Sequence, residues 1–168
     1  FPRSVGQLPL FYNHLNTGRP DPDSHIFNRY ASNYLDESNE PLYPFGYGLS
    51  YTDFVYGELQ ISSETLPKNG ELTVSVTVTN KGNYDGYETV QLYLRDIYAE
   101  VARPMKELKG FERIFLKSGE SRDVKFVITK DDLKFYNSEL HYVYEPGEFD
   151  VMVGPNSRDV QTKSFQAE

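Results

Sequence analysis

Cysteine is absent from the 168-residue sequence, and histidine, with three residues, is scarce. Without cysteine, a disulfide-stapled scaffold and thiol catalysis are both excluded. Basic clusters are also absent, and the formal net charge is −8. A nucleic-acid surface needs grouped Lys and Arg to replace counterions, so we expect no nucleic-acid partner. No apolar run approaches the roughly 20 residues that span a bilayer, so we expect no membrane partner either.

Aromatic side chains are abundant instead, with 14 Tyr and 11 Phe. Length and composition fit one globular domain with its own hydrophobic core. The sequence begins at Phe1 without Met or a signal-peptide pattern. We interpret this start as a point inside a longer polypeptide.

Residues 1–52, called the lead-in below, hold neither a period of 2 nor one of 3.6 for long. A short apolar stretch predicts one strand around Leu8–Tyr12. Four prolines punctuate the rest, namely Pro20, Pro22, Pro41 and Pro44. The lead-in also carries six later aromatic residues that need a surface to pack on, namely Tyr30, Tyr34, Tyr43, Phe45, Tyr47 and Tyr51. We therefore predict that it lies pressed against a folded surface and is not a flexible linker.

From Phe54 onward the pattern is that of an all-β protein. Segment 72–79 alternates strictly between aliphatic residues and Thr or Ser, which predicts a strand with one face in a core. Segment 90–95 alternates in the same way, so Gln91, Tyr93 and Arg95 are predicted to face outward. Further strands are expected at 108–116, 124–128 and 160–165.

Turn signals separate these strands at intervals of about 8–12 residues. Pro146 and Gly147 suit the second and third positions of a type II turn, which predicts a hairpin joining 142–144 to 149–153. Thr129 and Asp132 form a capping-box pattern, which predicts about one turn of helix between the two sheets. Together the signals predict an immunoglobulin/fibronectin-III-like β-sandwich preceded by an irregular, aromatic-rich lead-in.

Few residues of the sequence stand in patterns that suit catalysis. The three histidines show no metal-ligand spacing, so we expect His14, His25 and His141 to be exposed or singly hydrogen-bonded. Glycoside hydrolysis needs two carboxylates roughly 5–10 Å apart. The candidate pairs are Asp21 with Asp23, Asp36 with Glu37, and Asp131 with Asp132. The last pair is better explained by a helix N-terminus, and the first by a turn. No carboxylate is expected in an apolar strand where burial would raise its pKa.

Several ordered motifs resemble one protein family. Residues 41–52 (PLYPFGYGLSYT) are similar to the segment leading into the fibronectin-III-like domain of glycoside hydrolase family 3. The resemblance continues through residues 76–94 (VTVTNKGNYDGYETVQLYL), 103–126 (RPMKELKGFERIFLKSGESRDVKF) and 145–154 (EPGEFDVMVG). Upstream, residues 1–20 (FPRSVGQLPLFYNHLNTGRP) resemble the end of that family's α/β-sandwich domain. Nearly the whole chain is therefore similar to the C-terminal region of periplasmic β-glucosidases.

The resemblance implies where the chain divides into domains and which part of the parent protein carries the catalytic residues. Residues 1–52 would be the tail of the upstream α/β-sandwich domain with its linker, and 53–168 the fibronectin type III-like domain. In this family the nucleophilic Asp and the acid/base Glu usually lie upstream, and neither has a counterpart here. We therefore expect no catalytic residue, cofactor or metal ligand in the chain. The parent would be a bacterial, periplasmic or secreted retaining β-glucosidase acting on β-glucosides or oligosaccharides.

The sequence is compatible with two main roles for the chain. In the first, the sandwich packs on the upstream catalytic domains of the same polypeptide, with Tyr43, Phe45, Tyr47 and Tyr51 as interdomain anchors. In the second, an outward row of tyrosines binds β-glucans by stacking on sugar rings; its candidates are Tyr84, Tyr87, Tyr93 and Tyr98. A free-standing adhesion or oligomerisation module is the third and weakest alternative.

Overall fold

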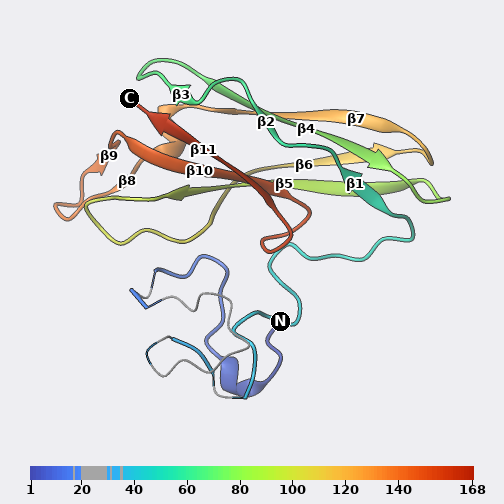
Figure 1. Cartoon of the computed structure of the whole chain (residues 1–168), viewed down its shortest axis with the longest axis horizontal. Coiled ribbons are helices and arrows are strands. Elements are labelled where there is room, and N and C mark those ends of the chain that lie inside the picture. Colours follow the sequence, from blue (N-terminus) through green and yellow to red (C-terminus); the bar gives the residue numbers. More distant parts are fainter. Residues whose placement is uncertain (17, 20–29, 31, 35) are drawn as a thin grey trace.

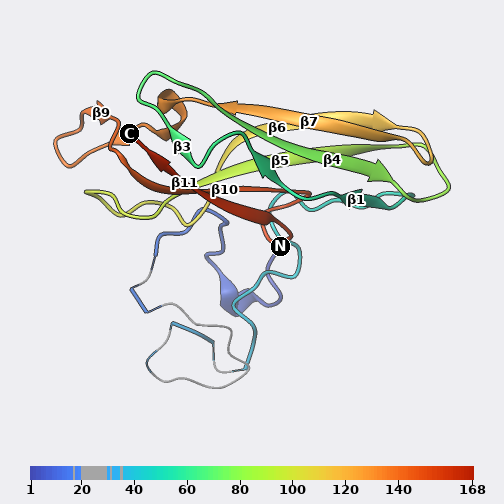
Figure 2. The same ribbon diagram turned by 45° about the horizontal axis from the view of Figure 1, so that its top comes forward.

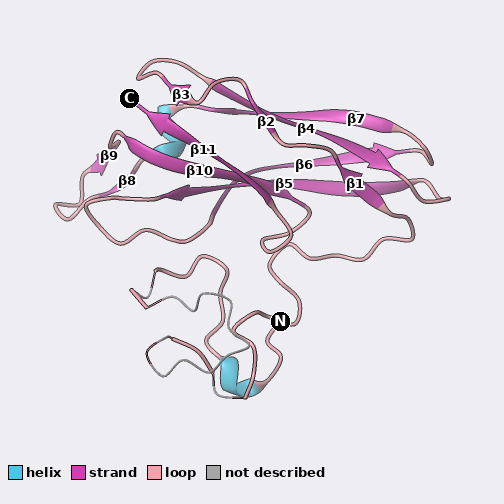
Figure 3. Cartoon of the chain, viewed as in Figure 1, coloured by secondary structure: helices cyan, strands magenta, loops and turns pink. Residues whose placement is uncertain are grey.

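The structure, a computed structural model, describes residues 1–16, 18–19, 30, 32–34 and 36–168. Two sheets stack as a sandwich, and the lead-in lies against one side of it (Figure 1; Figure 3). The elements in chain order are η1 (Val5–Gln7), β1 (Phe54–Tyr56), β2 (Gln60–Ile61), β3 (Thr65–Leu66), β4 (Leu72–Asn80), β5 (Gly86–Asp96), β6 (Glu107–Leu116), β7 (Ser121–Ile128), η2 (Lys130–Leu133), β8 (Phe135–Tyr136), β9 (Tyr142–Val143), β10 (Gly147–Gly154) and β11 (Gln161–Ala167). The predicted all-β sandwich is confirmed.

The first sheet is built around β4. It pairs antiparallel with β7 along its whole length and with the short strands β1 and β2 on its other side. The second sheet has the order β3-β11-β10-β5-β6, in which only the β11–β3 pair is parallel. A small third pair joins β8 to β9. Figure 2 shows the two main sheets lying one over the other along most of their length.

The core lies between the two sheets and follows the period-2 pattern of the sequence. In β4, Leu72, Val74, Val76 and Val78 are each at most 2% exposed. Val90, Leu92 and Leu94 of β5, and Phe149, Val151 and Val153 of β10, face them from the other sheet and are equally buried. Because β-branched side chains pack well on a pleated surface, this alternation both forms the strands and fills the core.

The connection between the sheets is as predicted. Thr129 and Asp132 form a reciprocal capping box, in which the Thr129 N–H donates to the Asp132 carboxylate at 2.8 Å. One 3₁₀ turn, η2, follows this cap, and Leu133 buries its side chain in the core. Asp131 and Asp132 therefore occupy the first turn of η2, where negative charge is favourable.

Two predicted elements are wrong. Residues 8–12 form no strand, since Pro9 has no N–H to donate and no strand of the described chain pairs its backbone with them. The expected hairpin of 142–144 with 149–153 does not form either. Its proposed turn residue Gly147 lacks the positive φ of a type II turn and instead begins β10. β10 finds its partners in β5 and β11, while β9 pairs with β8.

No helix in the described ranges is long and apolar enough to cross a membrane. The helical content described is limited to the single 3₁₀ turns η1 and η2.

Candidate functional site at the lead-in

The lead-in covers the outer face of β5, and this corrects one prediction. Gln91 and Tyr93, expected to face solvent, are 5% and 0% exposed. The Tyr93 ring lies edge-on to Tyr12 of the lead-in, with ring centroids 6.0 Å apart. Tyr12 in turn stacks on Phe45 at 4.1 Å. The two side chains do point away from the sandwich core, but the returning chain buries them.

Gln91 is the polar centre of this contact. Its amide nitrogen donates to the Gly46 carbonyl at 3.1 Å and to the Pro155 carbonyl at 2.6 Å, while its amide oxygen accepts from the Tyr93 hydroxyl. One side chain therefore joins β5, the lead-in and the loop after β10. Burial raises the pKa of Tyr93, so its hydroxyl stays protonated as the donor. Gly46 has a φ of 78°, and a Cβ there would lie 2.0 Å from the Gln91 amide oxygen.

Backbone hydrogen bonds add to this docking. The Ser157 N–H donates to the Phe45 carbonyl at 2.9 Å, and the Met105 N–H donates to the His14 carbonyl at 2.9 Å. The Tyr12 hydroxyl accepts from the Leu108 N–H at 3.3 Å. Three separate loops and strands of the sandwich thus hold two separated parts of the lead-in.

The lead-in also holds itself together through a buried glutamine. Gln7, at the end of η1, is 0% exposed. Its amide nitrogen donates to the Ser38 carbonyl at 2.6 Å, and its amide oxygen accepts from the Arg3 N–H. The N-terminal ammonium of Phe1 donates to the Tyr43 carbonyl at 2.7 Å. These contacts close residues 1–7 onto residues 38–43.

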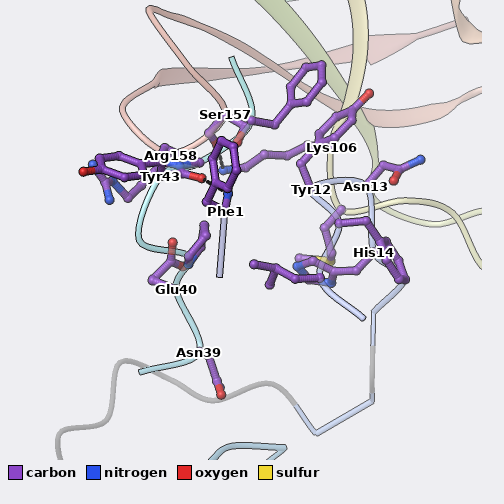
Figure 4. Close-up of a pocket in the computed structure, with 16 residues that line it drawn as sticks. Phe1, Tyr12, Asn13, His14, Asn39, Glu40, Tyr43, Lys106, Ser157 and Arg158 are labelled. Atoms are coloured by element: carbon purple, nitrogen blue, oxygen red, sulfur yellow. Dashed lines mark hydrogen bonds between the residues drawn. The ribbon is translucent and has the colours of Figure 1, made fainter. Parts of the chain in front are cut away.

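A cavity of about 460 Å³ lies between the lead-in and the sandwich. Figure 4 shows side chains from both parts around it, with Lys106 reaching in from the sandwich. Lys106 donates to the Ser157 carbonyl at 2.5 Å, and burial lowers its pKa while nearby Glu40 opposes that shift. Glu40 is the single carboxylate among the described lining residues. The two-carboxylate arrangement of glycoside hydrolysis is therefore not assembled around this cavity by the described residues.

The four predicted anchors lie at different depths. Tyr43, Phe45 and Tyr47 are 45%, 44% and 39% exposed, whereas Tyr51 is 98% exposed. Phe45 packs on Tyr12, and the Tyr43 and Tyr47 rings lie 5.2 Å apart. Three of the four rings thus make contacts within the chain, whereas Tyr51 is almost fully exposed.

The proposed sugar-stacking row is broken. Tyr84, Tyr87 and Tyr98 are exposed, as expected, but Tyr93 is buried under the lead-in. The Arg113 guanidinium lies 4.0 Å above the Tyr87 ring and covers one of its faces. Of the four candidates, Tyr93 is therefore not available to a sugar ring, and Tyr87 has one face covered.

Two strand carboxylates overturn the expectation that none is buried. Burial raises the pKa of Glu88 in β5, although the Tyr56 hydroxyl donates to it at 2.7 Å and favours its charged form. Burial also raises the pKa of Asp96, at the end of β5, to about 6. Neither lines the large cavity. The alternation of apolar and polar residues did not predict the burial of these two carboxylates, because both lie at the edge of the core, where neighbouring segments enclose them.

The other candidate groups stay apart. His14 and His141 are exposed with single ring contacts, to the Leu15 carbonyl and to Glu139. Glu37 lies beside Arg3 at 3.8 Å and shows no contact with Asp36 among the described interactions. Asp21, Asp23, His25, Pro20 and Pro22 lie outside the described residues. Among the residues that are described, no group of three or more His, Asp or Glu could hold a metal.

Comparison with known proteins matches part of this sandwich to a family model. Residues 88–157 match the model described as a fibronectin type III-like domain. The chain contains a fibronectin type III-like domain. The expected resemblance of the surrounding sequence to glycoside hydrolase family 3 β-glucosidases is also confirmed, and it is a similarity to the C-terminal part of longer chains.

Three relatives show the extent of that similarity. A periplasmic beta-glucosidase of Salmonella typhimurium is 51% identical over 167 residues, covering 99% of this chain and 22% of the relative. A putative beta-xylosidase of Formosa agariphila is 44% identical, with 98% and 20% covered. The crystal structure of a beta-glucosidase from Listeria innocua in complex with glucose is 45% identical with a TM-score of 0.90, covering 99% and 23%. The fibronectin type III-like domain and its lead-in thus span about one fifth of these relatives.

Proposed function

We propose that the chain is the non-catalytic C-terminal part of a bacterial periplasmic β-glucosidase, and that its fibronectin type III-like domain packs on and stabilises the catalytic domains of the same polypeptide. The parent would remove terminal β-D-glucosyl units with retention, using carboxylates outside this chain. The support is a similarity that covers nearly all of the chain but only about one fifth of the relatives named beta-glucosidase. The name of the Salmonella relative supports the periplasm.

The observation that carries the packing role is the apolar surface left on the lead-in. Leu49 and Tyr51 are 89% and 98% exposed, immediately before the buried Thr52. Folding of this chain alone does not bury these two side chains. Contiguous exposed apolar surface commonly marks an interaction site. We infer that they are buried against the upstream domains.

The two outer faces of the sandwich support the same orientation. The outer face of β4 presents Thr and Ser, as a solvated sheet does. The sheet that carries the lead-in instead exposes aromatic rings beside it, and Tyr87, Phe111 and Phe115 are 54%, 68% and 39% exposed. The upstream domains would therefore approach from the side of the lead-in.

The test compares Tyr51→Ala in this chain with the same change in the full-length parent. In this chain the melting temperature should not change, because the side chain is 98% exposed. In the parent, loss of a buried ring should cost about 2–4 kcal/mol. The control is Val127→Ala, on the outer face of β7, which should leave both proteins unchanged. An unchanged melting temperature of the Tyr51→Ala parent would refute the anchoring role.

A separate experiment tests whether such a parent exists. An antibody raised to this chain should detect, in an extract of the source organism, a polypeptide several times longer than 168 residues. A band of the size of the chain itself would contradict the proposal and favour a self-contained module.

A further inference from the structure

Oxidisable sulfur in this sequence is confined to two methionines, Met105 and Met152, because the chain has no cysteine. Met152 lies in β10 directly opposite Tyr93 of β5, so the two residues share the outer face of their sheet. Tyr12 of the lead-in lies against Tyr93 on that face. Met152 is 4% exposed but does not belong to the hydrophobic cluster between the two sheets. Its thioether is therefore enclosed by the segments that cover the outer face.

Met105 lies in the loop 97–106 that follows β5, at the point where the lead-in crosses it. Its N–H donates to the His14 carbonyl at 2.9 Å, and the preceding Pro104 forms a β-bridge with Leu15. Met105 is only partly buried. It lines the cavity of about 460 Å³ described above, and also a second cavity of about 350 Å³ that is formed mainly by the 97–106 loop. Each volume is many times the roughly 10–15 Å³ that one water molecule requires, so a molecule as small as hydrogen peroxide can reach Met105.

We propose that Met105 is an oxidation site for peroxides, and that its conversion to the sulfoxide loosens the lead-in from the sandwich. In this reaction the thioether sulfur attacks one peroxide oxygen: the O–O bond breaks, an S–O bond forms and the sulfur loses two electrons. Hydrogen peroxide is reduced to water, so atoms and electrons balance without a further reactant. The change is reversible, because methionine sulfoxide reductases return the sulfoxide to the thioether.

Oxidation weakens this contact because it turns a flexible apolar side chain into a polar one. Leu10 and Phe11 of the lead-in share the wall of the larger cavity with Met105, and Val101 and Ala102 share the wall of the second. The thioether gains from burial among such residues, whereas a sulfoxide kept there loses part of its hydration. The sulfoxide therefore favours a state in which the lead-in has left the loop.

The other methionine reports this opening. While the lead-in covers the outer face of β10, Met152 is shielded from solvent and hence from peroxide. Oxidation should therefore proceed in sequence, first at Met105 and then at Met152. Loss of the burial of a half-buried methionine raises the open population roughly fourfold to tenfold, and the reaction of Met152 should accelerate by the same factor.

The first test treats the chain with hydrogen peroxide and follows the gain of one oxygen at each methionine by peptide mapping and mass spectrometry. We expect Met105 to react first. Met152 should then react roughly fourfold to tenfold faster than it does in Met105→Leu, in which leucine keeps the apolar volume but has no sulfur to oxidise. Oxidation of Met152 before Met105, or equal rates at Met152 in the two proteins, would overturn the proposal.

The second test measures the docking itself by hydrogen exchange in Met152→Leu, where Met105 is the one remaining methionine. Peroxide should lower the protection of the Ser157 N–H, which donates to the Phe45 carbonyl of the lead-in. The amides of β4 and β7, which pair with each other, serve as the control and should stay protected. Methionine sulfoxide reductases should restore the protection of Ser157. Protection of Ser157 that survives oxidation of Met105 would show that the sulfoxide leaves the lead-in docked, against the proposal.

Discussion

Replacing Gly46 by alanine tests whether Gln91 joins the lead-in to the sandwich. The new Cβ would lie 2.0 Å from the Gln91 amide oxygen and 2.7 Å from its amide carbon, so the Gln91 side chain must move. Its bonds to the Gly46 and Pro155 carbonyls and to the Tyr93 hydroxyl would be lost together. Each buried group left without a partner costs about 1–3 kcal/mol.

Gly119 offers a matched control for the backbone. Its φ is 79°, against 78° at Gly46, but no atom lies within 4 Å of the position of its Cβ. Gly119→Ala should therefore cost only the strain of a left-handed residue, about 1–2 kcal/mol. Gly46→Ala should cost the same strain and about 2–4 kcal/mol more, for the loss of at least two buried hydrogen bonds.

Urea denaturation followed by circular dichroism measures both free energies of unfolding. A double-mutant cycle then isolates the contact: in a Gln91→Ala background, Gly46→Ala should cost no more than Gly119→Ala. Equal effects of the two glycine substitutions in the natural background would refute the role assigned to Gln91.

Three other changes probe the chain elsewhere. Asn80→Ala should cost about 3 kcal/mol or more in urea denaturation, because Asn80 is fully buried and its side chain binds Thr52, the Gly82 N–H and the Tyr84 and Leu116 carbonyls; a cost below about 1 kcal/mol would contradict this. Burial raises the pKa of Asp96 to about 6, so the folded state binds this proton more tightly than the unfolded state. The contribution of Asp96 to the free energy of unfolding should therefore fall as the pH rises from about 4 to about 6, and then stay constant. Because solvent screens the charge of this half-buried group, we expect a loss of about 1 kcal/mol, or about 3 °C in melting temperature. Asp96→Asn should remove that pH dependence. An identical pH profile in the variant and the natural chain would contradict the raised pKa of Asp96. Calorimetric titration with soluble β-glucan should give no heat, since the tyrosine row is interrupted at Tyr93; saturable binding would revive the carbohydrate-binding alternative.

Patterns among residues close in sequence were sufficient to predict the main strands of the sandwich and the turn of helix after β7. Strict alternation over 72–79 determines which side chains of β4 enter the core, because successive strand residues point to opposite faces. The Thr129–Asp132 capping box determines where η2 begins, since both of its hydrogen bonds form within four residues. Patterns that depend on neighbours in sequence therefore predicted these elements correctly.

Features that depend on distant partners were not predictable in this way. Residues 145–147 suit a turn, yet β10 is committed to β5 and β11, whose pairing involves residues far along the chain. Asp96 is a charged residue at the end of β5, and its burial results from residues of β6, η2 and the 97–106 loop that surround it.

Gln91 and Tyr93 show the same division most clearly. Their sequence positions correctly place them on the face of β5 that points away from the core. Whether that face meets water was decided by the lead-in, which covers it with Tyr12 and Phe45, residues far away in the sequence. The period-2 pattern determines the face to which each side chain points, because that pattern is a property of a single strand. Burial is decided by the tertiary structure, because it depends on every segment that packs against that strand.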